Sequence, residues 1–127
     1  MTTAGACLTS YAEAIAAADW PALRALLDDE ASVRLLHTGE RFDADGFVAF
    51  NRDYPGPWAF HREEVVDGDR RAVLRARVES DGATFHVATF ASLAASGRLT
   101  DVVEVWTEAV TPHPDRTPDR TPDRSST

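Results

Sequence analysis

A glutamate near the end of the chain stands where a carboxyl group could carry out acid/base chemistry. In the run Val-Val-Glu-Val-Trp, Glu104 alternates with Val102 and Trp106, so that on a strand all three side chains would share one face. Apolar neighbours exclude water from a carboxyl group and raise its pKa toward neutrality, which suits a general acid or base. The alternative is a structural ion pair, across strands, with Arg77 or Arg75.

Three further residues could assist such a carboxyl group. Arg77 and Glu79 are two positions apart, which places them on the same face of a strand, and an arginine close to Glu104 would favour its anion. His37 shares its expected face with Leu35 and could shuttle protons or bind a polar group of a ligand. A half-buried histidine with satisfied hydrogen bonds is the alternative for His37.

Aromatic residues surround the turn Tyr-Pro-Gly-Pro-Trp. Phe50, Tyr54 and Trp58 could form the mouth of a pocket for a flat or apolar ligand, because aromatic walls with few polar groups are typical of small-molecule sites. Alternatively, these side chains close the core where a helix meets a sheet.

The other common kinds of site have no motif in this sequence. The serines lack a Gly-X-Ser-X-Gly context and Cys7 has no local histidine partner, so nucleophilic catalysis is not supported. His61 and His86 have no second histidine at metal-ligand spacing, and there is no glycine-rich phosphate loop. We expect neither a metal nor a cofactor.

Two patterns predict the elements that would position these residues. Helices are expected over about 8–19, from Asp19 or Trp20 onward, and from Asp43 to Tyr54, where Pro55 ends the helix. A β-like stretch covers 31–37, and period-two runs at about 58–66, 71–79, 83–94 and 99–108 are separated by short glycine turns. Helices followed by a four-stranded antiparallel meander indicate an α+β fold, with room for a cavity between sheet and helices.

Composition narrows the class of protein. The chain has 127 residues, 43% of them hydrophobic, which fits one domain over 1–110. Residues 111–127 repeat Pro-Asp-Arg-Thr and are predicted to be a disordered tail. With neither a membrane span nor a signal peptide legible, we expect no membrane partner and a cytoplasmic location.

Charge excludes one class of partner. The 13 basic residues, all arginine, and the 21 acidic residues give a net charge of −8. Such a field repels phosphate backbones, so we expect no nucleic-acid partner. The use of arginine with no lysine, together with many alanines, is typical of a bacterium with high genomic GC content.

The order of motifs resembles the nuclear transport factor 2-like superfamily and, within it, the SnoaL-like proteins. The resemblance rests on YAEAIAAADWPALRALLDDEASV, FVAFNRDYPGPW and a Gly-Arg-Leu turn leading into VVEVW, and covers roughly residues 8–109. It implies a cone-shaped, curved antiparallel β-sheet wrapped around about three N-terminal helices. It also implies an apolar small molecule in the cone and a homodimer through the outer sheet face. The family includes ketosteroid isomerases, limonene-type epoxide hydrolases, polyketide cyclases and proteins without catalysis.

Compared with the isomerases, the sequence keeps one of three functional positions. Tyr11 matches the tyrosine of the oxyanion hole, although it could equally be a core residue. The proton-abstracting carboxylate is replaced by Leu35 and the second oxyanion donor by Thr89. Leucine cannot move a proton, so the comparison argues against ordinary ketosteroid isomerisation.

Compared with the epoxide hydrolases, the sequence keeps charged residues at the charged positions, but with glutamate in place of each aspartate. Arg77, Glu79 and Glu104 match an Arg-X-Asp pair and a last-strand Asp, so these three would converge. Each glutamate is one methylene too long for a site with a tolerance of about half an ångström. The tyrosine and asparagine that hold water are matched by Val33 and Leu35.

The cyclases require only a carboxylate on the last strand, which Glu104 supplies. The sequence therefore predicts a small-molecule-binding protein that, if catalytic, is a cofactor-free cyclase, isomerase or hydrolase of an apolar ketone or epoxide. Glu104 would be the acid/base, tuned by Arg77 and Glu79, with Tyr11 or His37 as hydrogen-bond donor. The expected pocket walls are Leu35, Phe50, Tyr54, Trp58, Thr89 and Trp106. The alternative is a non-catalytic ligand-binding or dimerisation module.

Overall fold

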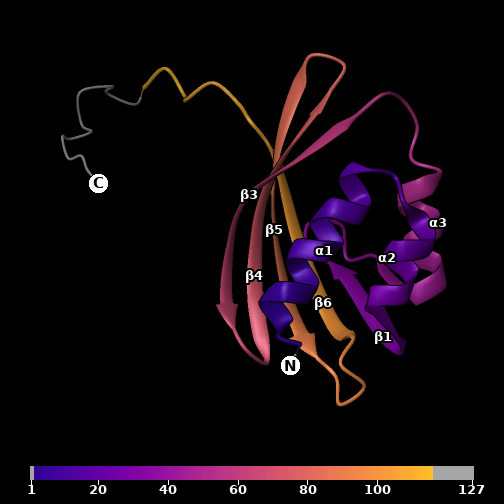
Figure 1. Cartoon of the computed structure of the whole chain (residues 1–127). Coiled ribbons are helices and arrows are strands. Elements are labelled where there is room, and N and C mark those ends of the chain that lie inside the picture. Colours follow the sequence, from indigo (N-terminus) through magenta and orange to yellow (C-terminus); the bar gives the residue numbers. More distant parts are fainter. Residues whose placement is uncertain (1, 116–127) are drawn as a thin grey trace.

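The computed structural model of the protein describes residues 2–115. Its elements are α1 (Ala4–Ala16), α2 (Trp20–Leu26), β1 (Leu27–Leu35), β2 (Arg41–Asp43), α3 (Ala44–Arg52), β3 (Ala59–Gly68), β4 (Arg71–Ser80), β5 (Ala83–Leu93) and β6 (Leu99–Glu108). The sheet curls around the helices, which lie on its concave side (Figure 1). Residues 111–115 are exposed, and the rest of the predicted tail lies outside the described residues. None of the helices in 2–115 is long and apolar enough to cross a membrane.

The helices begin at side chains that cap them. The hydroxyl of Thr3 accepts from the Ala6 N–H at 3.0 Å at the start of α1. The carboxylates of Asp19 and Asp43 do the same for α2 and α3, at 3.2 and 2.7 Å. The predicted starts of α2 and α3 are therefore confirmed, while α3 ends at Arg52, two residues before its expected end.

The sheet is larger than the expected meander. Its strand order is β2-β1-β6-β5-β4-β3, and β3 to β6 pair antiparallel as predicted. β1 adds to β6 in parallel, which makes the sheet mixed, and β2 extends the edge. β2 has only three residues, too few for a period-two pattern to be read. The expected α+β cone is confirmed.

Alternation along the strands separates a buried concave face from an exposed outer face. On β4, Ala72, Leu74, Ala76 and Val78 are buried. The residues between them point outward. Helix α1 packs its Leu8, Tyr11 and Ile15 stripe into the concave face. Ala18, expected on that stripe, is exposed and has a φ of 55° because the chain turns there toward α2.

One end of the cone is closed by the start of α1. Asp67, at the end of β3, accepts from the Thr3 hydroxyl at 2.9 Å and from the Gly5 N–H at 3.1 Å. A Cβ atom on Gly5 would lie 2.3 Å from Asp67 Cγ, so only glycine allows this approach. The Thr3 hydroxyl helps to hold the pKa of Asp67 below its usual range.

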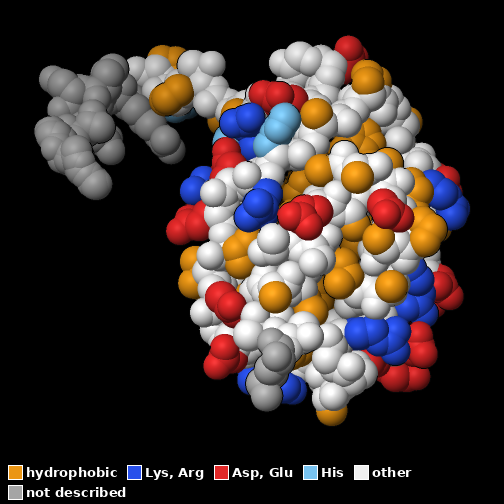
Figure 2. All heavy atoms as spheres, viewed as in Figure 1, with side chains coloured by type: hydrophobic (Ala, Val, Ile, Leu, Met, Phe, Trp, Pro, Cys, Tyr) orange, Lys and Arg blue, Asp and Glu red, His pale blue; other side chains and the backbone are white. Residues whose placement is uncertain are grey.

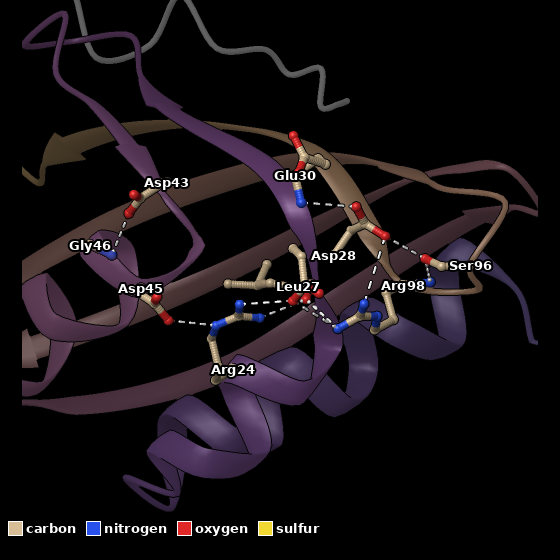
Figure 3. A network of polar contacts seen from close by, with 10 residues as sticks. Arg24, Leu27, Asp28, Glu30, Asp43, Asp45, Gly46, Ser96 and Arg98 are labelled. Carbon is tan, nitrogen blue, oxygen red and sulfur yellow. Dashed lines mark hydrogen bonds and ion pairs between the residues drawn. The ribbon is translucent and has the colours of Figure 1, made fainter.

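Two arginines tie α2, β1 and the β5–β6 turn together at the same end (Figure 3). Arg24 and Arg98 both donate to the Leu27 carbonyl oxygen, at 3.0 and 3.1 Å. Arg24 also pairs with Asp29 at 3.0 Å and with Asp45, the latter on α3, at 2.7 Å. Blue and red side chains gather accordingly at the lower right of Figure 2, where α2 and β1 lie. We call this set, with Asp28 and Ser96, the arginine network.

Candidate functional site

A cavity of about 530 Å³ opens at the other end of the cone, within the range of about 300–1,000 Å³ of small-molecule sites. The ends of α1, α3, β4 and β6 and the starts of β3 and β5 surround it. Most of its wall is apolar or aromatic, formed by Ile15, Leu35, Phe50, Tyr54, Trp58, Phe60, Val78, Phe85 and Trp106. The β4–β5 turn above it projects at the top of Figure 1, far from the β5–β6 turn of the arginine network.

The predicted aromatic residues line this cavity. Phe50 and Tyr54 lie edge to face with ring centroids 5.6 Å apart, on the side of α3. Trp58 packs against Trp20 at 6.4 Å on the side of β3. Aromatic contacts continue into the core through Phe42, Phe47 and Tyr11, the last pair stacked at 6.3 Å. The aromatic turn therefore serves both as pocket wall and as core.

Glu104 lies in the wall of the cavity and is only 3% exposed. It shares the concave face with Val102 and Trp106, as the alternation predicted. The Tyr11 hydroxyl donates a short hydrogen bond to Glu104 Oε2. The Thr89 hydroxyl donates to the same oxygen at 3.0 Å, and the Trp106 indole donates to Oε1 at 3.0 Å.

These contacts leave one acceptor position on the carboxylate. A carboxylate offers about four lone-pair sites, two on each oxygen. Tyr11 and Thr89 occupy both sites on Oε2, whereas Trp106 occupies one on Oε1. Neither Tyr11 nor Thr89 lines the cavity, whereas Trp106 does. The remaining lone pair is therefore on Oε1, the oxygen on the cavity side.

Burial governs the protonation of this cluster. It raises the pKa of Glu104 above its usual value, against the hydrogen bonds from Tyr11, Trp106 and Thr89, which act in the opposite direction. Burial, together with the nearby Glu104, also raises the pKa of Tyr11 well above its usual value. Tyr11 thus stays a proton donor, while Glu104 titrates nearer to neutrality. Because Tyr11 and Thr89 occupy both lone pairs of Oε2, a proton on Glu104 sits on the free lone pair of Oε1.

Strand pairing places Glu104 between two of the predicted positions. Its register partners are Leu35 on β1 and Thr89 on β5. Leu35 lines the cavity as expected. Thr89 is fully buried, and acts by orienting the carboxylate instead of forming a wall. The leucine at the position of the isomerase base is thus directly beside a carboxyl group on the neighbouring strand.

His37 lies at the rim of the cavity. It follows β1 in an exposed turn, and its Nδ1 accepts the backbone N–H of Trp106 at 3.4 Å. A neutral imidazole with an accepting Nδ1 carries its hydrogen on Nε2. His37 can therefore present an N–H donor to a molecule in the cavity, as its predicted role requires.

The predicted convergence of Arg77 and Glu79 with Glu104 is wrong. Both side chains lie on the outer face of β4, because the concave positions are taken by Ala76 and Val78. On that face Arg77 approaches Glu79 within 3.5 Å, and Glu79 pairs with His61 at 3.2 Å. The two-residue spacing does place Arg77 and Glu79 on one face of β4, as predicted, but that face is the outer one and not the concave one.

The alternative ion pair of Glu104 is excluded by the same face assignment. Arg75 also points outward and pairs with Glu63 at 2.8 Å and Glu64 at 3.3 Å. None of the arginines in residues 2–115 forms an ion pair with Glu104, which is surrounded by neutral donors instead.

Several cavity residues were not predicted. The apolar ones are Phe60, Val78 and Phe85. Alternation alone gives which residues share a face, so the prediction that Arg77 and Glu79 point inward assigned Val78 to the outer face. The acidic rim residues Asp81 and Glu108 carry no such signal. Asp81 sits in the β4–β5 turn with a φ of 52°, and its position depends on how that turn folds over the opening.

Comparison with solved structures places this architecture in a known fold. A candidate ketosteroid isomerase from Kribbella flavida has a TM-score of 0.83 at 23% identity, over 100% of this chain and 95% of that one. A nuclear transport factor 2-like protein of unknown function from Burkholderia xenovorans has a TM-score of 0.75 at 18% identity, over 83% of each chain. An epoxide hydrolase of the LEH-like type from M. tuberculosis has a TM-score of 0.65 at 13% identity, over 80% of each.

These likenesses establish the fold. No protein-family model matches the sequence, and no curated protein matches it. The chain has the nuclear transport factor 2-like fold, as the sequence motifs predicted. Identities of this size leave activity to be argued from the site itself.

Proposed function

We propose that the cavity binds a small, largely apolar molecule and that Glu104 acts on it as a cofactor-free general acid/base. The observation that carries this proposal is the single free lone pair of Glu104, on the oxygen at the cavity side. A buried carboxylate whose other positions are all held by donors is fixed in place, which is what general base catalysis requires.

A ketone-type substrate fits this arrangement. Glu104 Oε1 would remove a proton from the carbon beside the carbonyl group. The electron pair of that C–H bond would form the C=C bond of an enolate, and the π pair of the C=O bond would move onto the oxygen. The N–H on Nε2 of His37, a cavity-lining residue, would stabilise that oxygen. Return of the proton from Glu104 to another atom of the enol would complete an isomerisation or permit a cyclisation.

Tyr11 and Thr89 take part through Glu104 and not through the substrate. Both are fully buried and donate to Oε2. They keep the carboxylate oriented and limit how far burial can raise its pKa. A base whose pKa is raised above its usual value toward neutrality accepts and returns a proton more evenly near pH 7.

Hydrogen–deuterium exchange tests the proposed chemistry without knowledge of the natural substrate. A cyclic aryl ketone is incubated with the protein in D₂O, and loss of its α-proton signal is followed by NMR. We expect exchange faster than in buffer, and a fall of about 100-fold or more in Glu104→Gln, the scale of general acid/base catalysis. Glu13→Gln, on an exposed position of α1, is the matched control and should exchange at the wild-type rate.

The same experiment distinguishes the non-catalytic alternative. If the ketone binds, seen as shifts of cavity resonances, but Glu104→Gln exchanges as fast as the wild type, then the cluster is an oriented polar wall and the protein is a ligand-binding module. Binding without any acceleration over buffer would lead to the same conclusion.

We also propose that the outer sheet face forms a homodimer. Val66, Val73, Phe90 and Val103 are in register across β3, β4, β5 and β6. Val66 and Phe90 are 57% and 41% exposed. Val105, one row away, is 39% exposed. Exposure of an apolar row across four strands to water is unfavourable. In a twofold dimer, the same row of a second copy would cover it.

Light scattering after size exclusion tests the dimer. The wild type should elute with twice the monomer mass at micromolar concentration, and Phe90→Glu should elute as a monomer. Val110→Glu, at a site 81% exposed and beyond β6, should leave the dimer intact. A monomeric wild type would overturn the proposal.

A further inference from the structure

The cavity is acidic as well as aromatic. Its lining includes three carboxyl groups, Glu104 in the wall and Asp81 and Glu108, both exposed. None of the arginines in residues 2–115 lines it, and the sequence has no lysine to do so. An apolar pocket that contains only acidic charge is poorly suited to a carboxylate or phosphate ligand.

Several arginines of the described chain are paired with carboxylates away from the cavity. Arg24 and Arg98 belong to the arginine network at the opposite end of the cone. Arg75 and Arg77 pair with glutamates on the outer face. His37 lines the rim, where its Nδ1 accepts the backbone N–H of Trp106. The net charge of −8 also favours the approach of cations to the opening.

The aromatic walls complement a cation in a second way. Trp58 and Trp106 line the cavity, together with Phe85. The faces of aromatic rings, indoles above all, attract ammonium groups, and the attraction grows where water is excluded. Trp106 also donates its N–H to Glu104, which brings an indole and a carboxylate to the same place. Aromatic faces and carboxylates together favour the binding of an organic ammonium ion.

We propose that the ligand of this cavity is an organic cation, an apolar body that carries a protonated amine or quaternary ammonium group. The inference rests on the proposed function in that the cavity is taken to be the ligand site. An ammonium group occupies the lone pair that would act as the base, so a ligand held in this way is bound and not converted. The ammonium group lies between Trp106 and the free lone pair of Glu104 Oε1, and the rim carboxylates of Asp81 and Glu108 guide it inward. The apolar body fills the space against Phe50 and Phe85.

Three probes with one ring system and three charges test the preference. Naphthylmethylamine is a cation at neutral pH, naphthylmethanol is neutral and naphthoate is an anion. Titration calorimetry with the full chain should give an affinity for the amine about tenfold higher than for the alcohol, the ratio expected from about 1.4 kcal/mol of cation recognition. Naphthoate should bind more weakly than the alcohol.

Two sets of variants assign the preference to the named carboxylates. Glu104→Gln should reduce the amine affinity by about tenfold and leave the alcohol affinity within about twofold. The double variant Asp81→Asn/Glu108→Gln, at two exposed positions, should lower only the amine affinity, by about threefold at low salt and less at high salt. Glu13→Gln removes the same charge outside the cavity and should change neither affinity.

Each outcome decides a different point. Equal or tighter binding of the alcohol or of naphthoate would overturn the cation preference while leaving the cavity as the ligand site. An amine preference that survives in both carboxylate variants would place the cation elsewhere and also overturn the inference. If none of the three probes binds, the cation inference and the small-molecule site both fail, and the dimer surface becomes the functional feature.

Discussion

Glu104 and the arginine network show two ways in which this domain holds a carboxylate. Glu104 is buried at 3% exposure and is held by three neutral donors. Asp28, which is partly covered, lies within reach of Arg98 (Figure 3), and the exposed Asp29 pairs with Arg24. An arginine neutralises a carboxylate and fixes it as an anion, whereas at Glu104 burial favours the protonated form and the neutral donors favour the anion. Only the second kind of environment leaves a proton free to move.

The two regions respond to pH with opposite signs. Burial raises the pKa of Glu104, so its folded form binds more protons than its unfolded form, and stability falls as the pH rises through the elevated pKa. The hydroxyl of Ser96 lowers the pKa of Asp28, and a hydrogen bond from Arg24 lowers that of Asp29. Their contribution is present above their usual pKa and is lost as the pH falls.

Removal of one neutral donor should have the largest effect on stability. Tyr11→Phe deletes a buried hydrogen bond to a carboxylate, and we expect the free energy of unfolding to fall by about 2 kcal/mol at neutral pH. Urea denaturation followed by circular dichroism measures this loss. The control is Tyr54→Phe, the second tyrosine, which is 55% exposed and should lose almost nothing. An equal loss in both variants would show that Tyr11 acts through packing alone.

The opposite pH signs should appear in a comparison of two variants with the wild type. Above pH 4.5, the usual pKa of a glutamate, the stability of the wild type relative to Glu104→Gln should decrease as the pH rises. Relative to Asp28→Asn, it should instead decrease as the pH falls below 3.8, the usual value for an aspartate. Denaturant midpoints over this range test both. Parallel curves for the two variants would remove the distinction between the regions.

Salt should separate the regions by a smaller effect. Arg98→Gln breaks ion pairs with Asp28 and Asp29 and the hydrogen bond to the Leu27 carbonyl oxygen. Its loss of stability should be less than that of Tyr11→Phe, and the part that comes from the ion pairs should shrink at about 1 M NaCl. The loss in Tyr11→Phe should be the same at both salt concentrations, because the Glu104 cluster is buried. A salt-sensitive Tyr11→Phe would mean that the cluster is more open than the structure shows.

Local patterns were sufficient to predict most of the fold. The caps at Asp19 and Asp43, the proline after Tyr54 and the turns before each strand are encoded by neighbouring residues, and the structure confirms the caps and the strand runs within a few residues. The parallel pairing of β1 with β6 was not predicted, because a contact between the two ends of the chain leaves no local pattern.

The site was predicted where one strand was enough to define it. The side of Glu104 followed from Val102 and Trp106 on the same strand. Its partners Tyr11 and Thr89 were each selected as site residues, but not as donors to Glu104, since their elements meet only in the folded sheet. Arg77 was placed on the wrong face because alternation gives which residues share a side and not which side is buried.

The three tryptophans of the chain make their fluorescence a probe of the cavity. Trp58 and Trp106 line it, and Trp20 packs against Trp58 with ring centroids 6.4 Å apart. Indole emission from the protein therefore originates at or beside the cavity, with no fluorophore in the arginine network. A ligand in the cavity, or a change in the charge of Glu104 next to the Trp106 indole, should alter the tryptophan fluorescence of the unlabelled protein. Candidate ligands can therefore be screened by fluorescence titration before any substrate is known.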